Sequence, residues 1–265
     1  MIELRNIRKV FNQGKPNEVC AVDNVNCSID TRLVTVLRGP SGSGKTTLLS
    51  MVGCMSRPTS GRIMLGDREI TSLPERFLTE IRRRTFGFIF QQFHLIKGIT
   101  ALENVMLPAY PLGENHAALK TRALELLELF GVGARASSNV DWLSGGEAQR
   151  TACARALINN PAVIIADEPT AHLDTRLSRE FMDMIARFKD EGKGVIIASH
   201  DPLVFESAVV DRVVFVRDGK VDGGENQEPS GRRPSLVSRI HTANRGAGWQ
   251  DVPGSLLQSR QTAGN

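Results

Sequence analysis

A glycine-rich segment constrains the fold of this chain more than any other feature of the sequence. It lies between the apolar runs 33–37 and 48–52, which predict a strand before it and a helix after it, and it reads Gly39-Pro40-Ser41-Gly42-Ser43-Gly44-Lys45-Thr46-Thr47. Glycines let backbone N–H groups point inward with no Cβ in the way, and a helix start adds its positive dipole end. This succession predicts a phosphate-binding loop, in which Lys45 reaches the outer phosphates of a nucleotide and the Thr46 hydroxyl binds Mg²⁺.

Two adjacent carboxylates follow another apolar run. Residues 162–166 are a short continuous apolar stretch, typical of a parallel strand covered on both faces, and Asp167 and Glu168 come directly after it. One carboxylate of such a pair can hold Mg²⁺ through water, while the other polarises an attacking water as a general base. A solvated acidic pair is the alternative, but such a pair rarely follows a buried strand directly.

A histidine marks the end of the next predicted strand. The sequence favours a helix over 176–189 and a strand over 194–198, which complete a βαβ unit with His200 just beyond it. Ligands of open α/β sheets bind at the carboxyl ends of the strands. We therefore expect Gly39, Asp167 and His200 to meet at one rim of a sheet.

The other patterns predict an α/β fold with an added helical lobe. Apolar and polar residues alternate over 2–29, as in the half-buried antiparallel strands of an edge sheet. A helix is expected over 73–83 and a buried strand over 86–90. Residues 100 to about 130 are helical in composition, which predicts a helical lobe, approximately 92–158, inserted into a phosphate-loop core with a mixed sheet.

The C-terminal part of the chain has a different composition. Residues 222–265 contain no lysine, many Gly, Ser, Gln, Asn and Arg residues, and little apolar periodicity. This composition predicts a flexible extension, with one short helix near 235–242. One domain over residues 1–221 would then precede it.

Composition and charge narrow the class of protein. The 265 residues are 41% hydrophobic and 23% charged, within the globular range, and no apolar run approaches the roughly 18 residues of a membrane span. With no secretory pattern at the start either, the expected compartment is the cytoplasm. The net charge of +4 is a weak signal for nucleic acid, because the densest basic run, 82–84, ends a predicted helix. Buried, reduced thiols are expected at all four cysteines, Cys20, Cys27, Cys54 and Cys153, in place of disulfides or a zinc site.

A second anion-binding segment separates this chain from other phosphate-loop proteins. It reads Leu143-Ser144-Gly145-Gly146-Glu147 and opens a predicted helix, so a hydroxyl, backbone N–H groups and a dipole all point at an anion. With the phosphate loop, the acidic pair and the histidine in this order, residues 1–221 resemble the ATP-binding subunit of ABC transporters. The segment resembles that family's signature motif, in which Gln is the usual fifth residue.

The resemblance implies roles for several residues. Glu168 would be the general base, Asp167 a ligand of Mg²⁺, and His200 the residue that contacts the γ-phosphate. Gln91, after the strand that ends near residue 90, would be the lid glutamine that reaches Mg²⁺ and the water. Gln92 is an alternative one position along.

Two further positions are implied by the resemblance. Phe11 would stack on adenine, where the family commonly has Tyr, and packing in the core or along the edge strand is the alternative. Residues 171–174 match the loop that crosses to the other subunit, with Asp174 in it. His172 is unusual at its position in that loop.

The resemblance also implies partners. In the family, the phosphate loop of one subunit meets the signature of another in a head-to-tail dimer with two ATP molecules, which drives an integral membrane permease. The expected location is therefore the cytoplasmic face of the membrane, and no nucleic acid partner is expected. Residues 88–96 and 100–105 are most similar to the branch of lipoprotein-releasing and macrolide-export ATPases.

Other functions remain open at the level of the sequence. An ATPase of a cell-division membrane complex is close to the same branch. A non-transport ABC ATPase that acts on nucleic acid or ribosomes is a further alternative, but the chain lacks a coiled-coil insertion and a second ATPase module. A nucleotide-binding module without turnover is the third, and Asp167, Glu168 and His200 argue against it.

Overall fold

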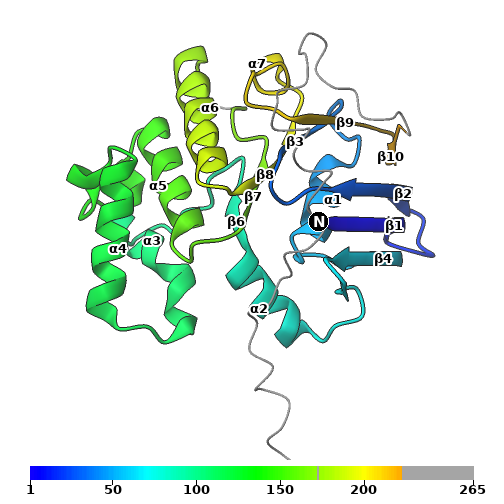
Figure 1. Ribbon diagram of the computed structural model, residues 1–265, viewed down its shortest axis with the longest axis horizontal. Helices are drawn as coiled ribbons and strands as arrows, with labels where there is room; N and C mark the ends of the chain where they lie inside the picture. Colours follow the sequence, from blue (N-terminus) through cyan, green and yellow to red (C-terminus); the bar gives the residue numbers. More distant parts are fainter. Residues whose placement is uncertain (172, 223–265) are drawn as a thin grey trace, which may run out of the picture. The chain divides into compact units, whose positions relative to one another are not determined.

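The computed structural model describes residues 1–171 and 173–222, which belong to one compact unit (Figure 1). His172 and the predicted extension beyond residue 222, with its short helix, lie outside the described residues. The strands are β1 (Ile2–Phe11), β2 (Val19–Ile29), β3 (Val34–Arg38), β4 (Ser60–Leu65), β5 (Arg68–Glu69), β6 (Phe86–Ile89), β7 (Val163–Asp167), β8 (Gly194–Ser199), β9 (Arg212–Arg217) and β10 (Lys220–Val221). The helices are α1 (Lys45–Val52), α2 (Glu75–Thr85), α3 (Ala101–Met106), α4 (His116–Leu129), α5 (Gly145–Leu157), α6 (Thr175–Asp190) and α7 (Pro202–Phe205), with 3₁₀ turns η1 (Leu107–Leu112), η2 (Gly133–Arg135) and η3 (Val140–Trp142).

The strands form two sheets, and the predicted α/β fold is confirmed. The first sheet has the order β2-β1-β4-β5 and is antiparallel, as the alternation over 2–29 predicted. The second has the order β10-β9-β3-β8-β7-β6. It is mixed, because β6, β7, β8, β3 and β9 run parallel while β10 is antiparallel to β9.

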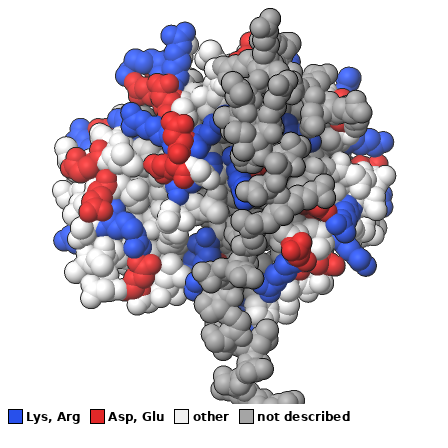
Figure 2. All heavy atoms as spheres, in the orientation of Figure 1, with Lys and Arg blue, Asp and Glu red and all other residues white. Residues whose placement is uncertain are grey.

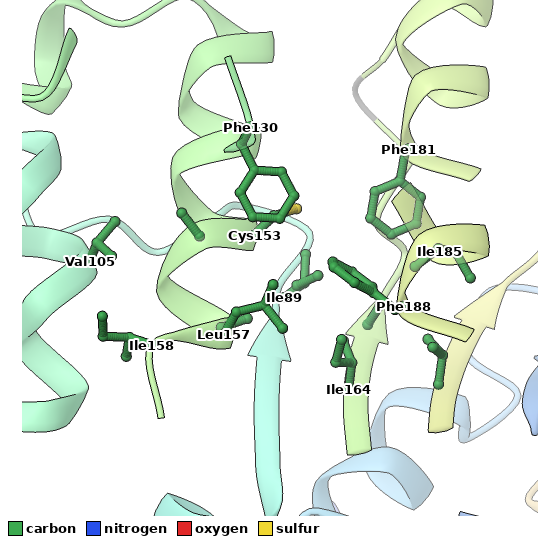
Figure 3. Close-up of a cluster of buried hydrophobic side chains, with 14 of the residues drawn as sticks. Ile89, Val105, Phe130, Cys153, Leu157, Ile158, Ile164, Phe181, Ile185 and Phe188 are labelled. Atoms are coloured by element: carbon green, nitrogen blue, oxygen red, sulfur yellow. The ribbon is translucent and has the colours of Figure 1, made fainter. Parts of the chain in front are cut away.

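Both faces of the parallel strands are buried, as their continuous apolar runs require. On β7, Ile164 packs in one hydrophobic cluster with the helical residues of α3 to α6, while Val163 and Ile165 pack in another with α1 and the antiparallel sheet. Figure 3 shows the first cluster, where side chains from α5 and α6 meet at the strand ends. These side chains cover one face of the strands that lead to the polar residues.

The four cysteines are free, but only two of them are buried as expected. Cys54 and Cys153 are buried, whereas Cys20 is exposed and Cys27 is half-buried, because both lie on β2 at the edge of the antiparallel sheet.

The segment between β6 and β7 is helical, but its helices are interrupted. The chain does not continue as one helix from residue 100 to 130, because α3 ends and the 3₁₀ turn η1 follows, with Pro111 inside it and Gly113 at φ 69°. Proline has no N–H for a helical hydrogen bond, so the helix restarts only after Asn115, whose side chain caps α4. The predicted limits of the lobe, 92–158, remain a prediction.

Charged residues on the surface are mixed in sign. On the face shown in Figure 2, Lys and Arg side chains lie among Asp and Glu side chains. The basic run at the end of α2 pairs with carboxylates of its own helix: Arg82 lies 2.7 Å from Glu75, and Arg83 lies 3.4 Å from Glu80, which also pairs with Arg84. The Arg84 side chain is still 71% exposed. None of the helices in residues 1–171 and 173–222 has the length and apolar character that a membrane span needs.

Candidate functional site

The glycine-rich loop joins β3 to α1, and at two of its glycines the backbone passes too close to neighbouring strands for a side chain. A Cβ on Gly39 would lie 2.0 Å from the carbonyl oxygen of Val216. Gly44 caps the helix in a left-handed conformation at φ 100°, and a Cβ there would lie 2.4 Å from the carbonyl oxygen of Ala21. No side chain caps α1, so its first N–H groups face the loop, as a phosphate site requires.

Two buried side chains of the loop, Lys45 and Ser43, carry groups that can donate hydrogen bonds to an anion. Lys45 is 5% exposed, and its Nζ donates to the carbonyl oxygens of Gly39 at 2.8 Å and Pro40 at 2.9 Å. The hydroxyl of Ser43 is also buried and has no hydrogen-bond partner among the described residues. A buried donor without an acceptor is costly, and a phosphate oxygen would satisfy it.

A hydroxyl and a carboxylate meet where α1 approaches the end of β7. The Thr46 hydroxyl donates to Oδ1 of Asp167 at 3.0 Å. Burial raises the pKa of the Asp167 carboxyl and the charge of Glu168 raises it further, while the Thr46 hydrogen bond and the charge of Lys45 lower it. A hydroxyl and a carboxylate oxygen side by side in a half-buried position fit Mg²⁺, which would stabilise the carboxylate that burial disfavours.

The raised pKa of Asp167 leads to a prediction about stability. The folded chain binds the Asp167 proton more tightly than the unfolded chain does, so its charge destabilises the fold at neutral pH. Asp167→Asn keeps an oxygen for the Thr46 hydroxyl and removes the charge. We expect it to raise the Tm of the nucleotide-free protein by a few degrees in a thermal melt at pH 7.

This gain should shrink as the pH falls through the raised pKa of Asp167 in the folded chain, and it should be lost below about 4, where Asp167 is protonated in the unfolded chain as well. Asp67→Asn, at an exposed position in the turn between β4 and β5, is the control and should leave Tm unchanged. An Asp167→Asn protein that melts below the unmodified chain at pH 7 would contradict the argument.

Glu168 and His200 contact each other at the ends of neighbouring strands. Nδ1 of His200 lies 3.0 Å from both carboxylate oxygens of Glu168, and Oε1 of Glu168 lies 3.5 Å from Nζ of Lys45. Glu168 has φ 43°, a left-handed conformation that costs a non-glycine residue about 1–2 kcal/mol. Its N–H donates to the carbonyl oxygen of Ala198 at 2.9 Å, which helps to hold this strained position. This backbone conformation places the Glu168 carboxylate between Lys45 and His200.

The signature segment forms the start of α5. The Ser144 hydroxyl accepts from the N–H of Glu147 at 3.3 Å, and the Glu147 carboxylate accepts from the N–H of Ser144 at 2.8 Å, which is a capping box. Arg135 donates to the other Glu147 oxygen at 2.9 Å. The Ser144 N–H and the Arg135 guanidinium lower the pKa of Glu147 to about 2. The Glu that replaces the usual Gln is therefore an ionised helix cap.

The structure does not bring the signature segment to the phosphate loop of the same chain. In the described part of the chain, no hydrogen bond or ion pair joins residues 143–147 to residues 39–47. Figure 1 shows α5 within the helical segment and α1 beside the antiparallel sheet. One chain therefore carries two separate anion-binding loops.

The predicted lid glutamine lies in the loop after β6. This strand pairs with β7, so Gln91 is at the same edge of the sheet as Asp167. Gln91 and Gln92 are both exposed. Exposure therefore does not separate the two glutamines.

Phe11 and Asp174 are placed at the ends of their elements. Phe11 ends β1 opposite Val19, is 43% exposed, and has the Lys9 amine 5.2 Å from its ring centre. This exposure contradicts packing of Phe11 in the core, whereas packing along the edge sheet, where Lys9 lies over the ring, stays the alternative to a role in the site. Asp174 caps α6 by accepting from the N–H of Leu177 at 2.8 Å.

The sequence did not single out two residues of α5 that contact these loops. Gln149, which is 2% exposed, donates to the carbonyl oxygen of Pro169, directly after Glu168. Arg155 donates to two carbonyl oxygens of the loop that follows Gln91. Helical periodicity marks apolar faces, so it carries no signal for a polar side chain that reaches a backbone carbonyl in another segment.

Comparisons with known proteins agree on one family. The family model described as "ABC transporter" matches residues 22–171. The uncharacterized ABC transporter ATP-binding protein YvrO of Bacillus subtilis is 42% identical over 221 residues, 83% of this chain and 95% of that protein. The macrolide export ATP-binding/permease protein MacB of Salmonella choleraesuis is 34% identical over 263 residues, 99% of this chain. The match spans only 40% of the length of that MacB.

Solved structures give the same result. The dimeric structure of a post-hydrolysis state of the ATP-binding cassette MJ0796, bound to ADP and Pi, aligns with a TM-score of 0.79 and 36% identity. It covers 88% of this chain and 100% of that one. These relatives do not favour the non-transport alternatives. The chain belongs to the ABC transporter family, as an ATP-binding subunit that hydrolyses ATP.

Proposed function

We propose that this chain powers a membrane permease through a head-to-tail dimer that closes on two ATP molecules and opens after hydrolysis. The observation that carries the proposal is the presence of two anion-binding loops that do not meet within one chain. One nucleotide needs only one phosphate cradle, so the segment 143–147 is available to a nucleotide held by another copy. The dimeric MJ0796 cassette with bound ADP and Pi supports this arrangement.

Each residue of the site has a part in the proposed reaction. Backbone N–H groups of residues 39–47 bind the phosphates, and Lys45 turns from its carbonyl acceptors to the outer phosphates. Glu168 takes a proton from the attacking water, and His200 holds the carboxylate in place and contacts the γ-phosphate. Gln91 would orient the water from the neighbouring strand end. Asp174 would reach the other copy.

Mg²⁺ fits beside Thr46 and Asp167, where it would neutralise charge that develops on the phosphates. Thr46 supplies a hydroxyl oxygen and Asp167 a carboxylate, which are the hard donors that this ion prefers. Gln91 would add an amide oxygen when its loop closes. The proposed nucleotide substrate is therefore the Mg²⁺ complex of ATP.

The exposed ring of Phe11 is proposed to stack on the adenine. Phe11→Ala should weaken ATP binding about 3–10-fold, since an aromatic pair contributes about 0.5–1.5 kcal/mol beyond the area it buries. Equilibrium titration with ATP measures the effect. Val19→Ala removes the exposed neighbour across the strand pair and is the matched control, expected to bind as the unmodified chain does. Equal affinity of the Phe11→Ala protein would contradict the stacking role.

The permease is proposed to be a separate chain of the export or lipoprotein-release type, with this subunit at the cytoplasmic face of the membrane. Two relatives support these parts of the proposal. The chain covers 95% of YvrO, which is named an ATP-binding protein, and MacB is named a macrolide export ATP-binding/permease protein. A cell-division ATPase is the alternative within the same branch.

Co-purification tests the proposed partner. A tagged Glu168→Gln chain, held in its ATP-bound form, is purified from detergent-solubilised native membranes, and the retained proteins are identified by mass. We expect one integral membrane protein in stoichiometric amount, and its number of spans and its extracytoplasmic domain separate export from cell division. Retention of soluble proteins or nucleic acid alone would contradict the permease and leave the ATPase activity intact.

A further inference from the structure

Arg155, in the last turn of α5, forms a clamp on the loop that follows β6. Its Nη1 donates to the carbonyl oxygen of His94 at 2.6 Å, and its Nη2 donates to that of Phe93 at 2.5 Å. Across residues 1–171 and 173–222, no carboxylate lies within ion-pairing distance of this guanidinium. Arg155 is half-buried. Taking a guanidinium partly out of water without a counter-charge costs free energy, which argues that its position serves a purpose.

The clamped residues have a strained backbone. Phe93 has φ 58° and His94 has φ 46°, and each left-handed non-glycine residue costs about 1–2 kcal/mol. Local turn hydrogen bonds support them: the N–H of Phe93 donates to the carbonyl oxygen of Phe90 at 2.9 Å, and that of His94 to Gln92 at 2.6 Å. Two consecutive residues of this kind need support from outside the loop as well.

Packing gives the loop little of that support. Phe90 and His94 line a cavity of about 390 Å³ between α2, β6, η1 and α5, with Arg155 on its wall. The His94 ring packs edge-on against Phe90, with ring centres 5.0 Å apart, and makes no other ring contact within the described residues. The two hydrogen bonds from Arg155 therefore stabilise the left-handed turn at residues 93 and 94, which borders the cavity.

We propose that Arg155 is the positioning residue for Gln91. The clamp fixes the backbone at Phe93 and His94, two and three residues after Gln91, and so restricts where the Gln91 side chain points. It also connects two motifs, because α5 runs from the cap Ser144 to Leu157, and Arg155 lies about 17 Å along the helix from Ser144. When Ser144 moves toward a nucleotide on the other copy, α5 moves with it, and the hydrogen bonds of Arg155 shift the loop that holds Gln91. This inference rests on the proposed function of Gln91 and of the dimer.

A double-mutant cycle tests the proposal. Arg155→Lys keeps the charge and the aliphatic stem but cannot donate to both carbonyls in the planar arrangement of a guanidinium. We expect it to lower kcat about tenfold in the chain with Gln91, and by less than about twofold in a Gln91→Ala chain, with KM for ATP little changed in both. Arg122→Lys is the matched control. It is the same substitution on α4, where Arg122 pairs with Glu114, and it should leave kcat unchanged.

Each outcome of the cycle is informative. Equal losses of kcat from Arg155→Lys with and without Gln91 would overturn the positioning role and leave the catalytic role of Gln91 standing. A Gln91→Ala chain with normal kcat would contradict the role of Gln91 itself, and the positioning proposal with it. Coupling of Arg155 to Gln92→Ala in place of Gln91→Ala would also overturn the proposal.

Hydrogen exchange gives a second readout that needs no turnover. In Arg155→Lys, the amides of residues 91–95 should exchange faster, while those of α5 and β7 keep their protection. If Arg155→Lys fails to fold, Arg155→Met retains a stem of similar reach, and the same measurement applies. Unchanged exchange over residues 91–95 in a folded Arg155 variant would overturn the proposal.

Discussion

ATP hydrolysis should fall about 10²–10⁴-fold in Glu168→Gln, with ATP affinity close to that of the unmodified chain, because general-base catalysis contributes an effect of that size. The amide has the shape of the carboxylate but cannot accept a proton from water. Its oxygen can still accept from Lys45 and from His200, which contact Glu168 at 3.5 and 3.0 Å. The loss should therefore fall on kcat and leave the binding site assembled.

Steady-state phosphate release and equilibrium ATP binding measure the two quantities separately. Glu125→Gln, at an exposed position on α4, is the matched control and should hydrolyse ATP normally. A Glu168→Gln chain with normal turnover would exclude Glu168 as the general base. A chain that no longer binds ATP would show that Glu168 serves mainly to hold the site together.

Lys45→Ala should weaken ATP binding on the order of 10–100-fold, because hydrogen bonds to charged groups contribute about 1.5–3 kcal/mol. The Nζ of Lys45 is buried, and its two carbonyl acceptors hold it at the mouth of the phosphate loop. Phosphate oxygens offer a better acceptor, since they bring negative charge. The substitution also leaves the Glu168 carboxylate without its nearest cation, so hydrolysis should be lost together with binding.

Isothermal titration with Mg²⁺ and ATP measures this change. Lys120→Ala, at an exposed position on α4, removes an equal charge away from the loop and should leave the affinity unchanged. Equal affinities of the Lys45→Ala and unmodified chains would contradict the assignment of the phosphate loop. Loss of affinity in both variants would point to net charge alone.

The parts of the site that the sequence predicts are those that follow strand ends. Residues 33–37 and 162–166 are continuous apolar runs with polar residues directly after them, and parallel pairing in the order β3-β8-β7 brings those residues to one edge. The contacts of Asp167 with Thr46 and of Glu168 with His200 follow from this rule. Apolar runs followed by polar residues, together with the rule that parallel strands end at one edge, were sufficient to predict these contacts.

Other features depend on tertiary contacts that no local pattern encodes. An aromatic residue at a strand end, such as Phe11, can face the core or solvent, and only the paired strands decide. The pairing of Glu147 with Arg135 joins two segments separated by a 3₁₀ turn. The break in the helical segment could have been predicted, because Pro108, Pro111 and Gly113 lie within six residues of one another. The hydrogen bonds of Arg155 to residues 93 and 94 could not have been predicted from any such local pattern.

In the proposed dimer, each ATP site combines the phosphate loop of one copy with the signature segment of the other. Two inactive variants test it when they are mixed. Lys45→Ala disables the phosphate loop, and Ser144→Asp keeps a good helix cap while placing a negative charge against the γ-phosphate. Each variant alone should hydrolyse almost no ATP, because every site in either homodimer contains a disabled half.

ATPase activity of the equimolar mixture is the decisive measurement. A mixed dimer has one site with both halves intact, so the mixture should recover about one quarter of the unmodified activity: half of the dimers are mixed, and one of two sites works in each. Recovery at that level supports a shared site. Activity of the mixture no higher than the average of the two variants would contradict the account, because it would mean that each chain builds its site alone.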